Sequence, residues 1–144
     1  MEIAKGFQLE QPRVFVSWGI THQELESLFQ GLGLRRVGDG FHLSGCSSLG
    51  GLSHSLGFSF SRTGGKLSEI GLHVPGVSIE ESYRQLQQHL IATFGPPTRT
   101  SPGEEMEECP HHTWLLPGVR VEHYVTEHFG PAERTYITKT QQDS

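Results

Sequence analysis

Two stretches of the chain place apolar residues at helical spacing, so that they share one side of a helix. In the first, over about residues 21–31, the apolar positions are Leu25, Leu28, Phe29 and Leu32. In the second, over about residues 79–94, they are Ile79, Tyr83, Leu86, Leu90 and Phe94, with Ile91 widening the stripe. The spacing predicts two amphipathic helices.

Both helices have clear start and stop signals. Thr21 stands three residues before Glu24, and Ser78 three residues before Glu81. In this arrangement the hydroxyl accepts the N–H of the third residue, while the glutamate reaches back to the first. Glycines at 31 and 33 end the first pattern, and Gly95-Pro96-Pro97 ends the second.

Between and after the helices, apolar and polar residues alternate with the period of two that is typical of half-buried strands. The clearest run is 55–61, with Leu56, Phe58 and Phe60 on one side, and 67–74 is its returning strand. Further strands are expected at 13–16, 34–37, 41–43, 113–116, 119–125 and 135–139. Residues 1–12 are expected to be a loose lead-in, 46–51 flexible, and 98–111 a polar loop.

These elements predict one α+β domain over residues 1–144, in which two helices cover one face of an antiparallel sheet. The helix-then-meander order occurs twice. We therefore expect two internal repeat units, about 18–75 and 76–139, and a sheet whose opposite face is partly open.

Composition narrows the function classes. The net charge of −5 disfavours nucleic-acid binding and suits a partner with a basic surface. The two cysteines, Cys46 and Cys109, are too few for a disulfide framework. Since no secretory signal or membrane-length apolar run is found, we expect a cytoplasmic protein that contacts neither membrane nor nucleic acid and needs no cofactor.

Two groups of residues are candidates for partner binding. The first is an acidic segment that is either a recognition element or an ordinary solvated loop: Glu104, Glu105, Glu107 and Glu108. The second is a mixed aromatic and charged set predicted on the open sheet face: Arg120, Glu122, Tyr124 and Tyr136. Trp18 and Trp114 either join this surface or cap the two halves of the core.

No motif identifies a reaction, because P-loop and Gly-x-Ser-x-Gly patterns are absent. An enzyme would have to use a metal or Cys/His hydrolytic site built from Cys109, His111, His112 and His123. A third possibility is a small-ligand pocket between helices and sheet, lined by Phe58, Phe60 and Tyr83. The predicted site contains no catalytic residue and no metal.

The repeated pattern resembles the tandem-repeat fold of beta-lactamase inhibitory protein and the related single-repeat outer-membrane lipoproteins. Each unit has a capped helix after a Trp-Gly-Ile-Thr or Pro-Gly-Val-Ser entry, a stop at or near Phe-Gly, and then a meander, over about residues 18–139. In size and class the chain also looks like cytoplasmic immunity proteins of bacterial polymorphic toxin systems. These resemblances imply a non-enzymatic protein that binds and occludes a partner, for example a toxin's active site.

Overall fold

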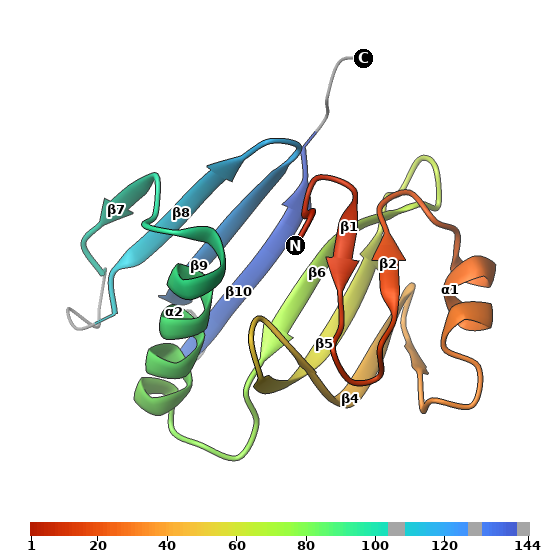
Figure 1. The fold of residues 1–144 in the computed structure, drawn as a ribbon, viewed down its shortest axis with the longest axis horizontal. Coiled ribbons are helices and arrows are strands. Elements are labelled where there is room, and N and C mark those ends of the chain that lie inside the picture. The colour runs from red at the N-terminus through yellow and green to blue at the C-terminus, as the bar shows by residue number, and fades with distance from the viewer. Residues whose placement is uncertain (104–108, 127–130, 141–144) are drawn as a thin grey trace.

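The computed structural model describes residues 1–103, 109–126 and 131–140, and its fold is α+β. An eight-stranded antiparallel sheet has the order β3-β4-β5-β6-β10-β9-β8-β7, and a separate two-stranded hairpin is formed by β1 and β2 (Figure 1). The two helices are α1 (His22–Leu28) and α2 (Ile79–Phe94). The strands are β1 (Gly6–Gln8), β2 (Phe15–Ser17), β3 (Arg35–Val37), β4 (Gly40–Ser48), β5 (Leu52–Phe60), β6 (Leu67–His73), β7 (Arg99–Ser101), β8 (His111–Leu116), β9 (Val119–Thr126) and β10 (Ala132–Lys139).

Both predicted helix caps are present. The side chain of Thr21 accepts the N–H of Glu24 while the Glu24 carboxylate accepts the N–H of Thr21, which completes a capping box. Ser78 accepts the N–H of Glu81 at the start of α2. Each cap supplies partners to N–H groups that a helix start leaves unpaired.

The predicted apolar stripes are only partly correct. Leu25 and Phe29 are buried, but Leu28 and Leu32 are 41% and 44% exposed. α1 has only seven residues and contacts the core through Leu25, Phe29 and the His22 ring, which stacks on Phe60, so Leu28 faces solvent. On α2 the stripe holds at Tyr83, Leu86 and Leu90, whereas Ile91, expected to widen it, is exposed.

Three segments expected to lack regular structure contain strands. Residues 1–12 are not a loose lead-in, because β1 pairs with β2 and buries Phe7. Residues 46–51 are not simply flexible: β4 continues to Ser48 past a bulge between Leu43 and Cys46, where Gly45 takes a positive φ of 71°. Within the expected polar loop at 98–111, residues 99–101 form strand β7.

Two four-stranded meanders meet in the middle of the sheet. The first, β3 to β6, follows α1, and the second, β7 to β10, follows α2. Their last strands, β6 and β10, pair with each other in register Ile70↔Ile137. This arrangement agrees with the predicted helix-then-meander order, while the internal repeat boundaries near residues 75 and 76 stay a prediction.

One face of the sheet carries the core. A row of inward residues crosses the central strands: Phe58, Ile70, Ile137 and Val121, all buried. Phe29 of α1 packs against Phe58, with ring centroids 5.6 Å apart, and α2 packs on the same side through Leu86 and Leu90. The two helices therefore cover one face, as predicted, and the β1-β2 hairpin adds Phe7 and Val16 to the same core.

Candidate functional site

The four described residues predicted for partner binding lie together on the open face. In β9 and β10, Glu122 stands opposite Tyr136, and Tyr124 opposite Arg134. Arg120 stands opposite Thr138. Because strand side chains alternate, this set points away from the buried Val121 and Ile137. The acidic segment with Glu104, Glu105, Glu107 and Glu108 lies outside the described residues.

Polar contacts hold these side chains in place. The Arg120 Nε donates to Glu122 Oε1 at 3.0 Å, and the other oxygen of Glu122 lies 3.1 Å from His111 Nε2. The His111 ring lies 4.6 Å from that of Tyr124. A group of aromatic rings and paired charges results, and His111, Glu122 and Tyr124 border a hollow in it. The rings offer area for contact with a partner. Because they are already held in place, little conformational entropy would be lost on binding.

Partial burial changes the pKa of Tyr124, the tyrosine at the centre of this group. Burial, the neighbouring Tyr136 hydroxyl and the Glu122 carboxylate together raise the pKa of Tyr124. Tyr124 therefore presents a neutral phenol, which can both donate and accept a hydrogen bond.

Sequence reasoning missed His111, Arg134 and Thr138 as members of this face. Thr138 donates to Glu69 Oε1 of β6 at 2.8 Å, which extends the polar surface across the centre of the sheet. The periodicity of β10 contained the necessary signal, since positions 134, 136 and 138 share a side. The predicted strand, however, began at 135 and omitted Arg134.

The two tryptophans belong to the core and its cap, the second of the two predicted interpretations. Trp114 is fully buried, and its Nε1 donates to the Gly95 carbonyl at 2.8 Å. Trp18 is half-buried and donates to the Ile3 carbonyl at 2.8 Å. Each indole thereby finds the partner that its buried N–H needs.

The residues of the alternative enzyme site are divided between the two faces of the sheet: His112 stands opposite His123, whereas His111 lies on the other face. His111 and His112 are neighbours in β8 and point to opposite faces: His111 contacts Tyr124 on the open face, whereas His112 lies near Trp114 and Tyr83 under α2. Among the residues described, no three His, Cys, Asp or Glu side chains are grouped as metal ligands would be.

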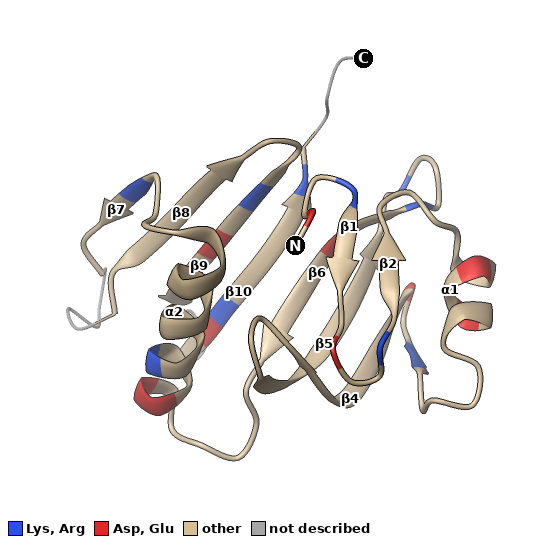
Figure 2. Ribbon diagram, viewed as in Figure 1, with Lys and Arg blue, Asp and Glu red and all other residues tan. Residues whose placement is uncertain are grey.

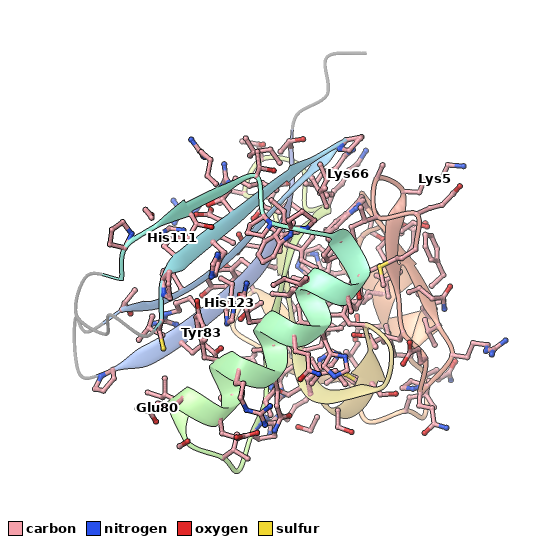
Figure 3. All side chains as sticks on the ribbon, turned by 60° about the vertical axis from the view of Figure 1, so that its left-hand side comes forward. Lys5, Lys66, Glu80, Tyr83, His111 and His123 are labelled. Carbon is pink, nitrogen blue, oxygen red and sulfur yellow. The ribbon has the colours of Figure 1, made fainter. Side chains whose placement is uncertain are left out.

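A buried polar cluster links α2 to the sheet instead. His123 is fully buried, with its Nε2 at 2.5 Å from Glu133 Oε2 and its Nδ1 at 2.8 Å from Gln87 Oε1. Ser82 donates to the other oxygen of Glu133. The Tyr83 ring stacks on His123 at 4.2 Å, and Figure 3 shows both side chains between α2 and the sheet.

The side-chain nitrogens of His123 and the carboxylate oxygens of Glu133 all have hydrogen-bond partners. Because both His123 nitrogens face oxygen acceptors, the ring fits as an imidazolium paired with the Glu133 carboxylate. Burial, together with Cys109 and Glu133, raises the pKa of Tyr83, whose hydroxyl donates to the Pro110 carbonyl at 2.5 Å. The cluster serves to hold α2 on the sheet.

A second buried pair was not foreseen. Ser48 Oγ lies 2.6 Å from His54 Nε2, and His54 Nδ1 donates to the Ser55 carbonyl at 2.8 Å. Hydroxyl–imidazole pairs also occur in nucleophilic catalysis, but Ser48 has no exposed surface and His54 is 2% exposed. Burial also raises the pKa of the adjacent Cys46 to about 11, which keeps this thiol protonated.

The three residues expected to line one ligand pocket do not share a cavity. Phe58 and Phe60 border a hollow at the β3–β5 end of the open face, while Tyr83 borders another beside α2. Of the helices described, none is long and apolar enough to cross a membrane.

Comparisons with known proteins find a distant likeness of fold. No protein-family model matches the sequence, and no curated protein matches it significantly. The structure is similar to the crystal structure of a DUF4309 family protein, YjgB, from Bacillus subtilis subsp. subtilis str. 168. The two are 15% identical with a TM-score of 0.48, and the match covers 83% of this chain and 78% of that chain.

Proposed function

We propose that this protein is a non-enzymatic binding module whose open sheet face contacts another protein. The observation that carries the proposal is the patch formed by Arg120, Glu122, Tyr124 and Tyr136 on the face that neither helix covers. Tyrosine and arginine are the residue types that most often anchor protein interfaces.

The finer form of the proposal is an immunity protein that occludes a toxin's active site in the cytoplasm. It is supported by the small α+β fold and by an acidic sequence, which suits a toxin with a basic cleft. In this form the 99–112 segment, with its four glutamates, meets the basic part of the partner beside the tyrosine patch.

The test is capture of partners from native cells by the tagged protein, with mass spectrometry after a salt wash. The variant Tyr124→Ala removes a ring from the patch, and Phe15→Ala removes one from the β1-β2 hairpin, which lies on the other side of the sheet. One stoichiometric protein should be retained by the wild type and the Phe15 variant, and Tyr124→Ala should bind it at least about tenfold more weakly.

Unfolding curves accompany the capture, so that a folding defect is not mistaken for lost contact. Equal capture by all three proteins would remove the open face from the proposal. Absence of any stoichiometric protein would favour the ligand-binding or enzymatic alternatives.

A further inference from the structure

One row of the open face crosses all eight strands and has a gap near its middle. The register places these residues side by side: Arg35, His42, Gly57, Gly71, Tyr136, Glu122, Thr113 and Arg99. Neighbouring strands lie about 4.8 Å apart. Gly57 and Gly71 are neighbours in this row and have no side chains. The sheet face is therefore bare across two strands between His42 and Tyr136.

The two glycines differ in what lies above them. A Cβ atom on Gly71 would come within 3.3 Å of the Tyr136 ring, so this ring leans over Gly71. A Cβ atom on Gly57 would meet nothing within 4 Å. The gap above Gly57 belongs to a hollow of about 310 Å³, with the Tyr136 ring as one wall.

The rim of this hollow carries hydrogen-bond donors. Arg134 and His73 are exposed at its border, and His42 lies half-buried on the side opposite Tyr136. Within the described residues, the side chain of Arg134 makes no ion pair or hydrogen bond, while its backbone pairs with β9. Glu133 also borders the hollow, but its carboxylate points to the core side of the sheet, where it is bound to His123 and Ser82.

The charge on the open face favours an anionic ligand. Its described strand positions carry four arginines and two glutamates: Arg35, Arg99, Arg120, Arg134, Glu69 and Glu122. Glu122 is paired with Arg120 and His111, and Glu69 accepts from Thr138. A guanidinium that has no carboxylate partner among the described residues, at the edge of a hollow, suits an incoming carboxylate.

We propose that the hollow above Gly57 receives an aspartate or glutamate side chain of the protein partner. The carboxylate binds Arg134, with the imidazoles of His42 and His73 beside it, and the methylene groups lie against the Tyr136 ring. This inference rests on the proposed function and adds to it that the partner presents an acidic anchor at this point.

The first test uses a capped amino acid in place of the partner. N-acetyl-glutamate N-methylamide is titrated into the ¹⁵N-labelled protein at low ionic strength, where charge pairs are least screened. Saturable shifts are expected at the amides of Gly57, Gly71 and His73 at millimolar concentration. The glutamine analogue has the same shape without the charge and should bind at least about tenfold more weakly.

Two variants locate the binding. Gly57→Val projects into the hollow from a Cβ that would meet no atom within 4 Å, and valine suits a strand, so this variant should fold and lose the shifts. Arg134→Gln should weaken binding about tenfold. The controls are Ser59→Val, two residues along the same face, and Arg62→Gln in the β5-β6 turn, which should both bind the probe as the wild type does.

Equal binding of the glutamate and glutamine probes, or no shift at the hollow, would overturn the inference. So would capture of the partner by Gly57→Val at the wild-type level, although a loss with Tyr124→Ala would still support the proposed function. If the probe binds at the hollow but no protein is captured, the protein occupant is wrong and the failure belongs to the proposed function.

Discussion

At the scale of single residues, the fold buries two histidines in different protonation states. His123 faces two oxygen acceptors and fits the charged form. His54 donates from Nδ1 to a carbonyl and accepts from Ser48 at Nε2, so it fits the neutral form. Burial lowers the pKa of His54, and the hydrogen bond to the Ser55 carbonyl opposes this only in part.

The neutral state of His54 predicts a loss of stability in acid. The unfolded state takes up a proton near pH 6.5, whereas folded His54 does so only at lower pH, so the unfolded state binds more protons between the two. The contribution of His54 to the free energy of unfolding should therefore be level above about pH 7 and fall below pH 6.5, by at most about 1.4 kcal/mol per pH unit.

Urea unfolding at a series of pH values checks this prediction. His54→Gln should be less stable at pH 7 but show a shallower decline toward pH 5. His112→Gln is the comparison: the pKa of His112 is also lowered, by burial and by the charges of His123 and His111, but this side chain is half-buried. A wild-type slope in the His54 variant would contradict the assignment.

At the scale of elements, α2 is fixed to the sheet by polar as well as apolar contacts. Leu86 and Leu90 supply the apolar part. Ser82 and Gln87, also on α2, bond to Glu133 of β10 and His123 of β9. The helix is therefore bonded to β9 and β10 through the buried pair His123 and Glu133. Removal of either residue should weaken the contacts of α2 with both strands.

Truncation of Glu133 should be strongly destabilising. Its side chain is 5% exposed, and Glu133→Ala would leave His123 with a buried charge and no counterion. Breaking such a pair from one side costs roughly 3–5 kcal/mol. Glu133→Gln retains an oxygen acceptor for the ring and should cost less.

Denaturant unfolding of the two variants measures this difference, and Glu69→Ala on the open face serves as the control. In the described part of the chain, the Glu69 side chain accepts one hydrogen bond, from Thr138 at the sheet surface, so its loss should change stability little. Equal stabilities of Glu133→Ala and Glu69→Ala would show that the pair does not hold α2.

The sequence predicted the long elements well and the short ones poorly. α2 was found with its bounds because five apolar positions, a serine cap and Gly95-Pro96 all agree. β1 and β7 were missed because they lie in stretches that are polar overall, whereas the equally short β2 and β3 overlap the predicted strands 13–16 and 34–37. At Gly45 a bulge shifts the register of β4, and a glycine there is equally compatible with a loop.

The residues of the candidate site could be predicted from the sequence only in part. Arg120, Glu122 and Tyr124 follow from the alternation of one strand, and this placed them correctly on one face. The pairing of β10 with β6 brings Gly71 under Tyr136, and it depends on residues 65 positions apart, which no local pattern reveals. The hollow could therefore be found only from the folded structure.

At the scale of the whole molecule, the negative charge is unevenly distributed. Six of the sixteen acidic residues and none of the eleven lysines and arginines lie outside the described residues. The described part therefore carries one more positive than negative charge, and Figure 2 shows its charged positions spread over both helices and the strands. The acidic character of the protein comes from the segments between and after its strands.

This distribution predicts an effect of charge on the rate of association. Reversing Glu104, Glu105, Glu107 and Glu108 to lysine should slow association with a basic partner at low salt and leave the dissociation rate nearly unchanged. Kinetics with the captured partner at several salt concentrations test this, with Glu26→Lys and Glu80→Lys at exposed helix positions as the charge control. An unchanged association rate at low salt would exclude the acidic segment from the contact.

The order of the strands also limits how a partner can attach. The strands at the two margins of the sheet, β3 and β7, have three residues each, and all six of these residues are exposed. Addition of a partner's strand to a sheet requires a long row of free backbone groups, and short margins of this kind oppose it. Recognition must therefore depend on side chains, so a partner would be selected by the shape and charge it presents and not by a tendency to extend the sheet.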